Sequence, residues 1–276
     1  MAAPSYSLGK TLLKIDNVSL SYDDRPVLSG VTAEVRDIIV PGKVQGQVVG
    51  ILGPSGCGKT TLFRIIAGLH APTSGRVSVN GFDRPVIAGE VGVVAQSYPL
   101  FEHRSVLGNL MLGAQKKEKD AKVARDKVMA FLTEFGLEDK YNLYPAQLSG
   151  GQRQRCAIIQ QILCSEHFLL MDEPFSGLDL IMLEKTCELI AKVADMDDLN
   201  TIIVVTHDVT AACSVADHLW LMGHGPGDDG KTLPGSRIVK QYNLIDRDLC
   251  WQPNIITTAR FTDFVREVKK NSGGYK

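Results

Sequence analysis

Residues 53–61 combine three glycines with a lysine and hydroxyl side chains, a set that suits the binding of phosphate groups. The run is Gly53, Pro54, Ser55, Gly56, Cys57, Gly58, Lys59, Thr60 and Thr61. Glycines let the backbone curl so that several N–H groups face one anion, and the start of a following helix adds positive potential there. The glycine–lysine–threonine spacing matches the P-loop pattern. It predicts that Lys59 contacts the β- and γ-phosphates of ATP and that Thr60 binds Mg²⁺.

Two acids stand where a P-loop needs a second partner for its metal ion. Asp172 and Glu173 directly follow the apolar run 168–171. Such a run indicates a buried strand, and acids at its carboxyl end can reach a phosphate site on a neighbouring strand. We expect Asp172 to hold Mg²⁺, mainly through its water shell, and Glu173 to orient and polarise the attacking water. Taken alone, the two acids would also fit a strand that ends at a solvated turn.

A second candidate anion site lies at Leu148-Ser149-Gly150-Gly151-Gln152, just before a predicted helix. A serine hydroxyl and two glycines at a helix start favour anion binding. With this pentapeptide the chain resembles the ATP-binding cassette (ABC) family, whose signature is LSGGQ. The resemblance implies that Ser149, Gly150, Gly151 and Gln152 face the γ-phosphate held by the P-loop of a partner subunit.

The resemblance extends over residues 12–224 and assigns four further roles. Gln96 resembles the glutamine that senses Mg²⁺ and the attacking water, and His207 resembles the switch histidine that contacts the γ-phosphate. Asp179 resembles the aspartate that reaches across the dimer, and Tyr22 sits where the family stacks an aromatic ring on adenine. Taken alone, His207 would fit a histidine at a strand end, and Tyr22 a turn or core aromatic.

Alternating and apolar patterns predict the elements that position these residues. Residues 13–20 and 27–35 are predicted to form antiparallel strands around a turn at 22–26, and 36–47 a turn-rich connection. The expected buried strands are 48–52, 91–95, 168–171 and 201–206, and the expected helices are 59–67, 117–135, 150–164 and 261–270, with a loop after Met222. This order predicts an α/β fold: a P-loop NTPase core with a mostly parallel sheet, an N-terminal antiparallel β-subdomain and an inserted α-helical subdomain at about 97–165. The expected domains are a single ATPase domain over 12–224 and a C-terminal extension over 225–276.

Composition narrows the class of partner. With 30 basic and 31 acidic residues the net charge is −1, which argues against nucleic acid as the main partner. Six scattered cysteines without metal-ligand spacing suit reduced thiols of a cytosolic protein. No signal peptide is visible and no apolar run reaches the roughly 18 residues of a membrane helix. We therefore expect a peripheral protein on the cytoplasmic face of the inner cell membrane.

A single cassette of this kind resembles the separate ATPase chains of the nitrate, sulfonate and taurine importers. The resemblance implies a second ATPase subunit (an identical copy or a paralogue), integral-membrane permease subunits and an extracytoplasmic solute-binding protein. Tyr98, Leu100 and Phe101 would suit a groove for the permease, or would pack into the helical subdomain. Two other classes are a non-transport ABC ATPase acting on nucleic acid or in translation, and a binding cassette without activity. Within the first class, the short distance between P-loop and signature argues against repair and chromosome types, and the single cassette argues against translation factors. The presence of Lys59, Asp172, Glu173 and His207 argues against the second class.

Overall fold

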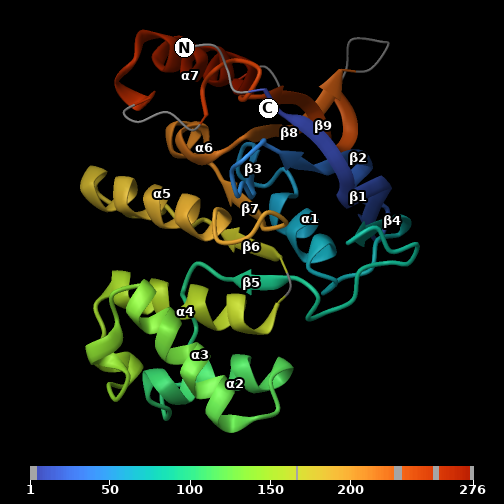
Figure 1. Cartoon of the computed structure of the whole chain (residues 1–276). Helices are drawn as coiled ribbons and strands as arrows, with labels where there is room; N and C mark the ends of the chain where they lie inside the picture. The colour runs from blue at the N-terminus through green and yellow to red at the C-terminus, as the bar shows by residue number, and fades with distance from the viewer. Residues whose placement is uncertain (1–4, 166, 227–231, 251–254, 274–276) are drawn as a thin grey trace.

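The computed structural model describes residues 5–165, 167–226, 232–250 and 255–273. Within them, nine strands form one sheet in the order β4-β1-β2-β9-β8-β3-β7-β6-β5 (Figure 1). The strands are β1 (Ser7–Tyr22), β2 (Arg25–Ile39), β3 (Gln47–Leu52), β4 (Ser74–Val79), β5 (Gly92–Val94), β6 (Phe168–Asp172), β7 (Thr201–Thr206), β8 (His218–Pro226) and β9 (Thr232–Asn243). The helices are α1 (Lys59–Ile66), α2 (Val106–Lys117), α3 (Ala121–Glu134), α4 (Gly150–Cys164), α5 (Leu180–Ala194), α6 (Val209–Val215) and α7 (Ala259–Gly273).

The sheet has a parallel half and an antiparallel half. Strands β8, β3, β7, β6 and β5 pair in parallel, whereas β1 pairs antiparallel with both β2 and β4. Strand β9 joins the halves, since it pairs antiparallel with β8 and touches β2 in a short parallel register. The predicted α/β class, with a parallel core and N-terminal antiparallel strands, is confirmed.

The parallel strands are apolar throughout because both of their faces are covered. Side chains alternate along a strand, so Val49 and Ile51 of β3 enter the cluster beneath α1, whereas Val48 enters the cluster on the opposite face. In β7, Val205 and Val204 divide in the same way. Burial on two faces gives the continuous apolar runs from which these strands were predicted.

Helices α2, α3 and α4 gather beside the β5–β6 edge of the sheet (Figure 1). The buried Asn109 side chain fixes the segment that leads into α2: its amide nitrogen donates to the carbonyl oxygens of Phe101, Arg104 and Ser105. Gly113 lets α2 approach α4 closely, since a Cβ atom there would lie 2.7 Å from the Gln160 carbonyl oxygen. Together the three helices form the unit that carries the Ser149 segment.

The C-terminal part of the chain packs onto the same sheet. Helix α7 buries Phe261, Phe264 and Val268 in a cluster that also holds Ala212 of α6 and Leu219 of β8. The final helix predicted at 261–270 is therefore present and longer, and the tail predicted to follow it lies partly outside the described residues.

Three boundaries differ from the sequence-based expectation. The helix predicted over 117–135 is present as α3 but begins at Ala121, because Asp120 caps it by accepting the N–H groups of Lys122 and Val123; Lys117 is the last residue of α2, a helix that the sequence analysis did not predict. Strand β2 continues to Ile39, into the predicted connection. The loop predicted after Met222 was wrong at both ends, since β8 runs to Pro226 and β9 begins at Thr232; residues 227–231 lie outside the described residues.

Candidate nucleotide-binding site

The predicted site residues gather at the carboxyl ends of neighbouring parallel strands. The P-loop follows β3, His207 follows β7, Asp172 ends β6, and Gln96 lies just past β5. These strands are consecutive in the sheet. The carboxyl edge of a parallel sheet is where α/β folds bind ligands, so four separate sequence segments converge on one place.

The P-loop has the backbone conformation that its glycines permit. Gly56 and Gly58 both have φ of 82°, in the left-handed region that disfavours residues with a Cβ atom. Gly58 is the N-cap of α1, so the positive end of that helix faces the loop. Lys59 is buried, and its Nζ donates to the carbonyl oxygens of Gly53 and Pro54 at 2.8 and 3.0 Å. The lysine thus closes the loop into a ring around the position where an anion would bind.

The beginning of the loop is packed tightly against β8. A Cβ atom at Gly53 would lie 2.7 Å from the Cys57 sulfur and 2.8 Å from the Met222 carbonyl oxygen. Burial raises the pKa of the Cys57 thiol, although Lys59 opposes this shift. Cys57 is therefore a packing residue of the loop and stays protonated near neutral pH.

Asp172 and Glu173 lie in different environments although they are neighbours. Burial, and then the charge of Glu173, raise the pKa of the Asp172 carboxyl, while Lys59 and Arg64 lower it. Glu173 has φ of 49°, an uncommon conformation for a residue with a side chain. Its backbone N–H donates to the Val205 carbonyl oxygen at 2.8 Å, which keeps this strained residue against β7.

Glu173 and His207 are in direct contact. The His207 Nδ1 atom lies 2.9 Å from each carboxylate oxygen of Glu173. The Thr206 hydroxyl donates to Oε2 of Glu173 at 3.1 Å and accepts the backbone N–H of Asp208. The Glu173 carboxylate is therefore oriented by two side chains from the end of β7. The sequence analysis missed Thr206, for which only its position before His207 gives a signal.

The segment after β5 leaves Gln96 exposed and Tyr98 half-buried. Gln96 is exposed in the turn that follows the strand. Tyr98 and Leu100 pack against the core shared with the helical layer, while Phe101 remains 51% exposed. Of the three residues considered for a permease groove, Tyr98 and Leu100 are thus partly buried against the core. Gln154, a further residue that the sequence did not indicate, donates to the Tyr98 hydroxyl at 2.9 Å.

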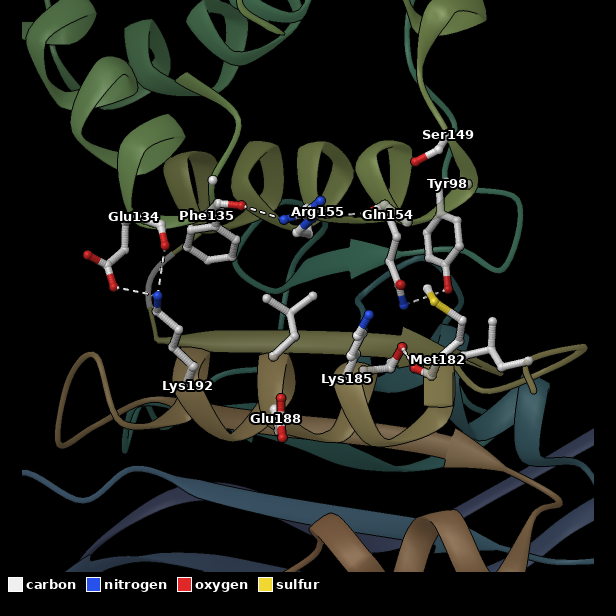
Figure 2. Close-up of a pocket in the computed structure, with 16 residues that line it drawn as sticks. Tyr98, Glu134, Phe135, Ser149, Gln154, Arg155, Met182, Lys185, Glu188 and Lys192 are labelled. Carbon is white, nitrogen blue, oxygen red and sulfur yellow. Dashed lines mark hydrogen bonds and ion pairs between the residues drawn. The ribbon is translucent and has the colours of Figure 1, made fainter. Parts of the chain in front are cut away.

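The signature segment lies at the start of α4, apart from the P-loop. Ser149 caps the helix: its hydroxyl accepts the Gln152 N–H, and the Gln152 side chain accepts the Ser149 N–H in return. Ser149 and Gly150 are exposed, and a Cβ atom at Gly150 would meet nothing within 4 Å. These residues border a cavity of about 980 Å³ between α4 and α5 (Figure 2). P-loop residues do not line this cavity.

The remaining predicted residues occupy the edges of this region. Asp179 caps α5 by accepting the N–H of Met182 at 2.9 Å. The next two residues, Leu180 and Ile181, are 70% and 66% exposed, which is unusual for large apolar side chains. Tyr22 ends β1 and lies against the His70 ring with a centroid separation of 5.8 Å.

The oxygen donors at the sheet edge suit a magnesium ion whose remaining ligands are phosphate oxygens. Thr60 is exposed at the first turn of α1, and Asp172 is partly buried and close enough to Lys59 and Arg64 to feel their charge. Within the described parts of the chain, no group of three or more His, Cys, Asp or Glu residues could hold a metal by itself. A hydroxyl and one carboxylate suit Mg²⁺, which usually keeps waters and binds through substrate phosphates.

Comparison with known proteins agrees with this geometry. The ABC transporter family model matches residues 43–176, from the approach to β3 to Ser176. The spermidine/putrescine import ATP-binding protein PotA of Spiroplasma citri is 36% identical over 91% of this chain and 69% of its own length. The chain belongs to the ABC transporter ATPase family. Membership places it among the ATP-binding, ATP-hydrolysing subunits of transporters.

Two further relatives extend the comparison. The sulfate/thiosulfate import ATP-binding protein CysA of Synechocystis sp. is 36% identical over 76% of this ABC ATPase, which spans only 58% of that relative's length. A dimeric ATP-binding cassette solved in a post-hydrolysis state with ADP and Pi has a TM-score of 0.65, with 26% identity over 84% of this chain and 99% of that one. Among the described residues, none of the helices is long and apolar enough to cross a bilayer.

Proposed function

We propose that this ABC ATPase binds ATP·Mg²⁺ between two cassettes and uses its hydrolysis to drive a membrane permease that imports a small solute. The observation that carries the proposal is the convergence at one sheet edge of the P-loop, Asp172 and the Glu173–His207 pair. Phosphoryl transfer needs positioning and electrostatic stabilisation more than covalent chemistry, and this edge supplies both.

The P-loop and the residues around it would hold the triphosphate. Lys59 would exchange its bonds to the Gly53 and Pro54 carbonyl oxygens for the β- and γ-phosphates, so that the positive charge is already in place. Thr60 and Asp172 would hold Mg²⁺, with Gln96 nearby at the end of β5. The ion would bridge phosphate oxygens and neutralise charge. Tyr22 would stack on the adenine.

Glu173 and His207 would act on the water that attacks the γ-phosphate. The Glu173 carboxylate accepts from Thr206 and contacts His207, so two side chains at the end of β7 hold it beside the P-loop edge. The carboxylate would hold the water in line and take up its proton, while His207 would contact the γ-phosphate. The bond between the γ-phosphorus and the oxygen that bridges it to the β-phosphate breaks as the water oxygen attacks, which leaves ADP and inorganic phosphate.

A second cassette would complete the site. Ser149 and Gly150 are exposed and Gly151 is half-buried at a helix start, and all three border a cavity that the P-loop of the same chain does not line. They are therefore available to a nucleotide held by another copy or a paralogue. The exposed Leu180 and Ile181, next to Asp179, would be covered by the same association.

Import is the direction that the relatives' names favour, since one serves polyamine import and the other sulfate or thiosulfate import. The proposal places this cassette on the cytoplasmic face of the membrane with permease subunits and an extracytoplasmic solute-binding protein. The nitrate, sulfonate or taurine class is the solute proposed from the sequence resemblance. Polyamines and sulfate are the competing solutes that the relatives suggest.

Two measurements test the proposal. Purified protein should release inorganic phosphate from ATP with Mg²⁺ and should form an ATP-dependent dimer when Glu173 is replaced by Gln, as measured by light scattering. Cells that carry the cassette and its permease should take up a labelled solute, tested as taurine, nitrate, putrescine and sulfate in parallel. Absence of ATP hydrolysis by wild-type protein, alone and with permease, would refute the enzymatic part.

A further inference from the structure

The Tyr98 hydroxyl connects three segments that are far apart in the sequence. It donates to the Pro174 carbonyl oxygen at 3.2 Å and accepts from the Gln154 side-chain nitrogen at 2.9 Å. Tyr98 lies two residues after Gln96, and Pro174 directly follows Glu173. Figure 2 shows the Gln154 amide and the Tyr98 hydroxyl pointing toward each other, on the side of the cavity where α4 begins at Ser149.

Both bonds are partly buried, and each joins the half-buried Tyr98 to a buried partner. Gln154 is 4% exposed, and Pro174 is buried. Burial raises the pKa of Tyr98 to about 12, so the phenol stays protonated and remains a donor at physiological pH. Buried polar groups that lose their partner are costly, which makes this pair of bonds specific to one arrangement.

The backbone on either side of the connection is strained and needs support. Tyr98 and Glu173 have φ of 46° and 49°. On one side, Glu173 is held by its N–H bond to the Val205 carbonyl oxygen of β7. On the other side, the bond from Tyr98 holds the Pro174 carbonyl, which belongs to the peptide between Pro174 and Phe175, one residue beyond Glu173. The backbone that carries Glu173 is therefore held by β7 before it and by Tyr98 just after it.

Gln154 brings α4 into the same linkage. It stands on α4, whose first residues, Gly150 and Gly151, follow the Ser149 cap. An α-helix moves nearly as a rigid body, so a displacement of its N-terminus also displaces Gln154. At the other end of the cavity, Lys192 of α5 pairs with Glu134, the last residue of α3 (Figure 2).

We propose that Tyr98 is a positioning residue through which the seating of α4 on a nucleotide sets the direction of the Glu173 carboxylate. The inference rests on the proposed function. It assigns Tyr98 no contact with ATP. When Ser149 and Gly151 engage the γ-phosphate of the partner's nucleotide, Gln154 and Tyr98 would hold Pro174, and with it Glu173, in the hydrolytic geometry.

Tyr98→Phe tests the inference, because it keeps the ring and removes both bonds. The expected result is a kcat for ATP hydrolysis lower by about tenfold, with a KM for ATP within about twofold of wild type, since positioning and not binding is lost. Gln154→Met should also lower kcat with KM unchanged. The double variant should be no slower than Tyr98→Phe, because both changes interrupt one linkage.

The matched control is Tyr242→Phe. Tyr242 is also buried, and its hydroxyl accepts from Asn271 at 2.7 Å, in the C-terminal cluster. This variant should lose comparable stability in thermal unfolding and keep wild-type kcat and KM. In a Glu173→Gln background, Tyr98→Phe should still form the ATP-dependent dimer.

Three results would overturn the inference: wild-type kcat in Tyr98→Phe, additive losses in the double variant, or a loss of kcat that comes with loss of ATP binding and of the dimer. The last would show that Tyr98 only supports the fold. If Tyr98→Phe fails to fold, Gln154→Met alone decides between a lowered and an unchanged kcat. An inactive wild-type protein would contradict the proposed function instead, so the two failures are distinguishable.

Discussion

Replacing Lys59 by alanine separates the two roles that the structure gives this residue. In the structure, its Nζ donates to two carbonyl oxygens of the P-loop from a buried position. Hydrogen bonds from a charged group contribute about 1.5–3 kcal/mol, so the unliganded Lys59→Ala variant should lose about 2 kcal/mol of stability. With nucleotide, the lysine would change partners to the phosphates, and its loss should also remove binding.

The second effect is measured as the thermal shift that a nucleotide produces. A ligand at 100 times its Kd stabilises the folded state by about 2.7 kcal/mol. For a domain of this size that raises Tm by about 5–10 °C. Wild-type protein should show this shift with Mg²⁺ and a non-hydrolysable ATP analogue, and Lys59→Ala should show almost none at the same concentration.

The control is Lys14→Ala, which removes an exposed lysine of β1 on the antiparallel half of the sheet. It should leave both the unliganded Tm and the analogue-induced shift unchanged. If Lys59→Ala lost stability but still showed the wild-type rise in Tm with the analogue, Lys59 would only stabilise the loop and would not bind the nucleotide. The assignment of residues 53–61 as a triphosphate site built around this lysine would then be refuted.

Three further predictions concern the same sheet edge. Glu173→Gln should hydrolyse ATP at least about a hundredfold more slowly and trap an ATP-bound dimer; normal turnover would exclude the carboxylate from catalysis. Gly58→Ala should weaken nucleotide binding more than Gly56→Ala. Both substitutions cost about 1–2 kcal/mol because the residue keeps a left-handed φ, but only the methyl group at position 58 would crowd Leu28, at 3.0 Å. Calorimetric Kd values in the reverse order would contradict this. Asp172→Asn should abolish Mg²⁺-dependent hydrolysis yet raise the unliganded Tm at neutral pH. The folded pKa of Asp172 is raised, so ionising it costs stability as pH rises through that pKa; an unchanged gap in Tm between pH 4 and pH 8 would oppose it.

The elements that carry the candidate phosphate site were predictable because their signals are local. The glycines of residues 53–61 indicate the backbone conformation of the loop directly. The apolar runs before Gly53, Asp172 and His207 indicate strands that are buried on both faces. Neighbouring positions in the sheet then follow from the carboxyl-edge rule for parallel strands. The fold class was accessible for the same reason.

The features that depend on distant partners were not predictable. The sequence analysis did not predict α5. Its first two residues, Leu180 and Ile181, are apolar but exposed, so apolar side chains do not lie on the buried face alone as in an amphipathic helix. Glycine and proline around Pro226 favour a loop, but pairing of β8 with β9 overrides that preference. The inward direction of Tyr98 depends on Pro174, which lies 76 positions away.

The place of β9 in the sheet has a consequence for how the chain acquires its structure during synthesis. Strands β1 and β2 are synthesised before the parallel strands, but among the described strands they connect to them in the sheet through β9 and β8, which are synthesised after them. The P-loop strand β3 also waits for β8 on one side and β7 on the other. Such late, long-range pairing slows folding and leaves strand edges open in the meantime. We therefore expect the sheet of the nascent chain to remain incomplete, with strand edges that can pair with other chains, until residue 243 has left the ribosome.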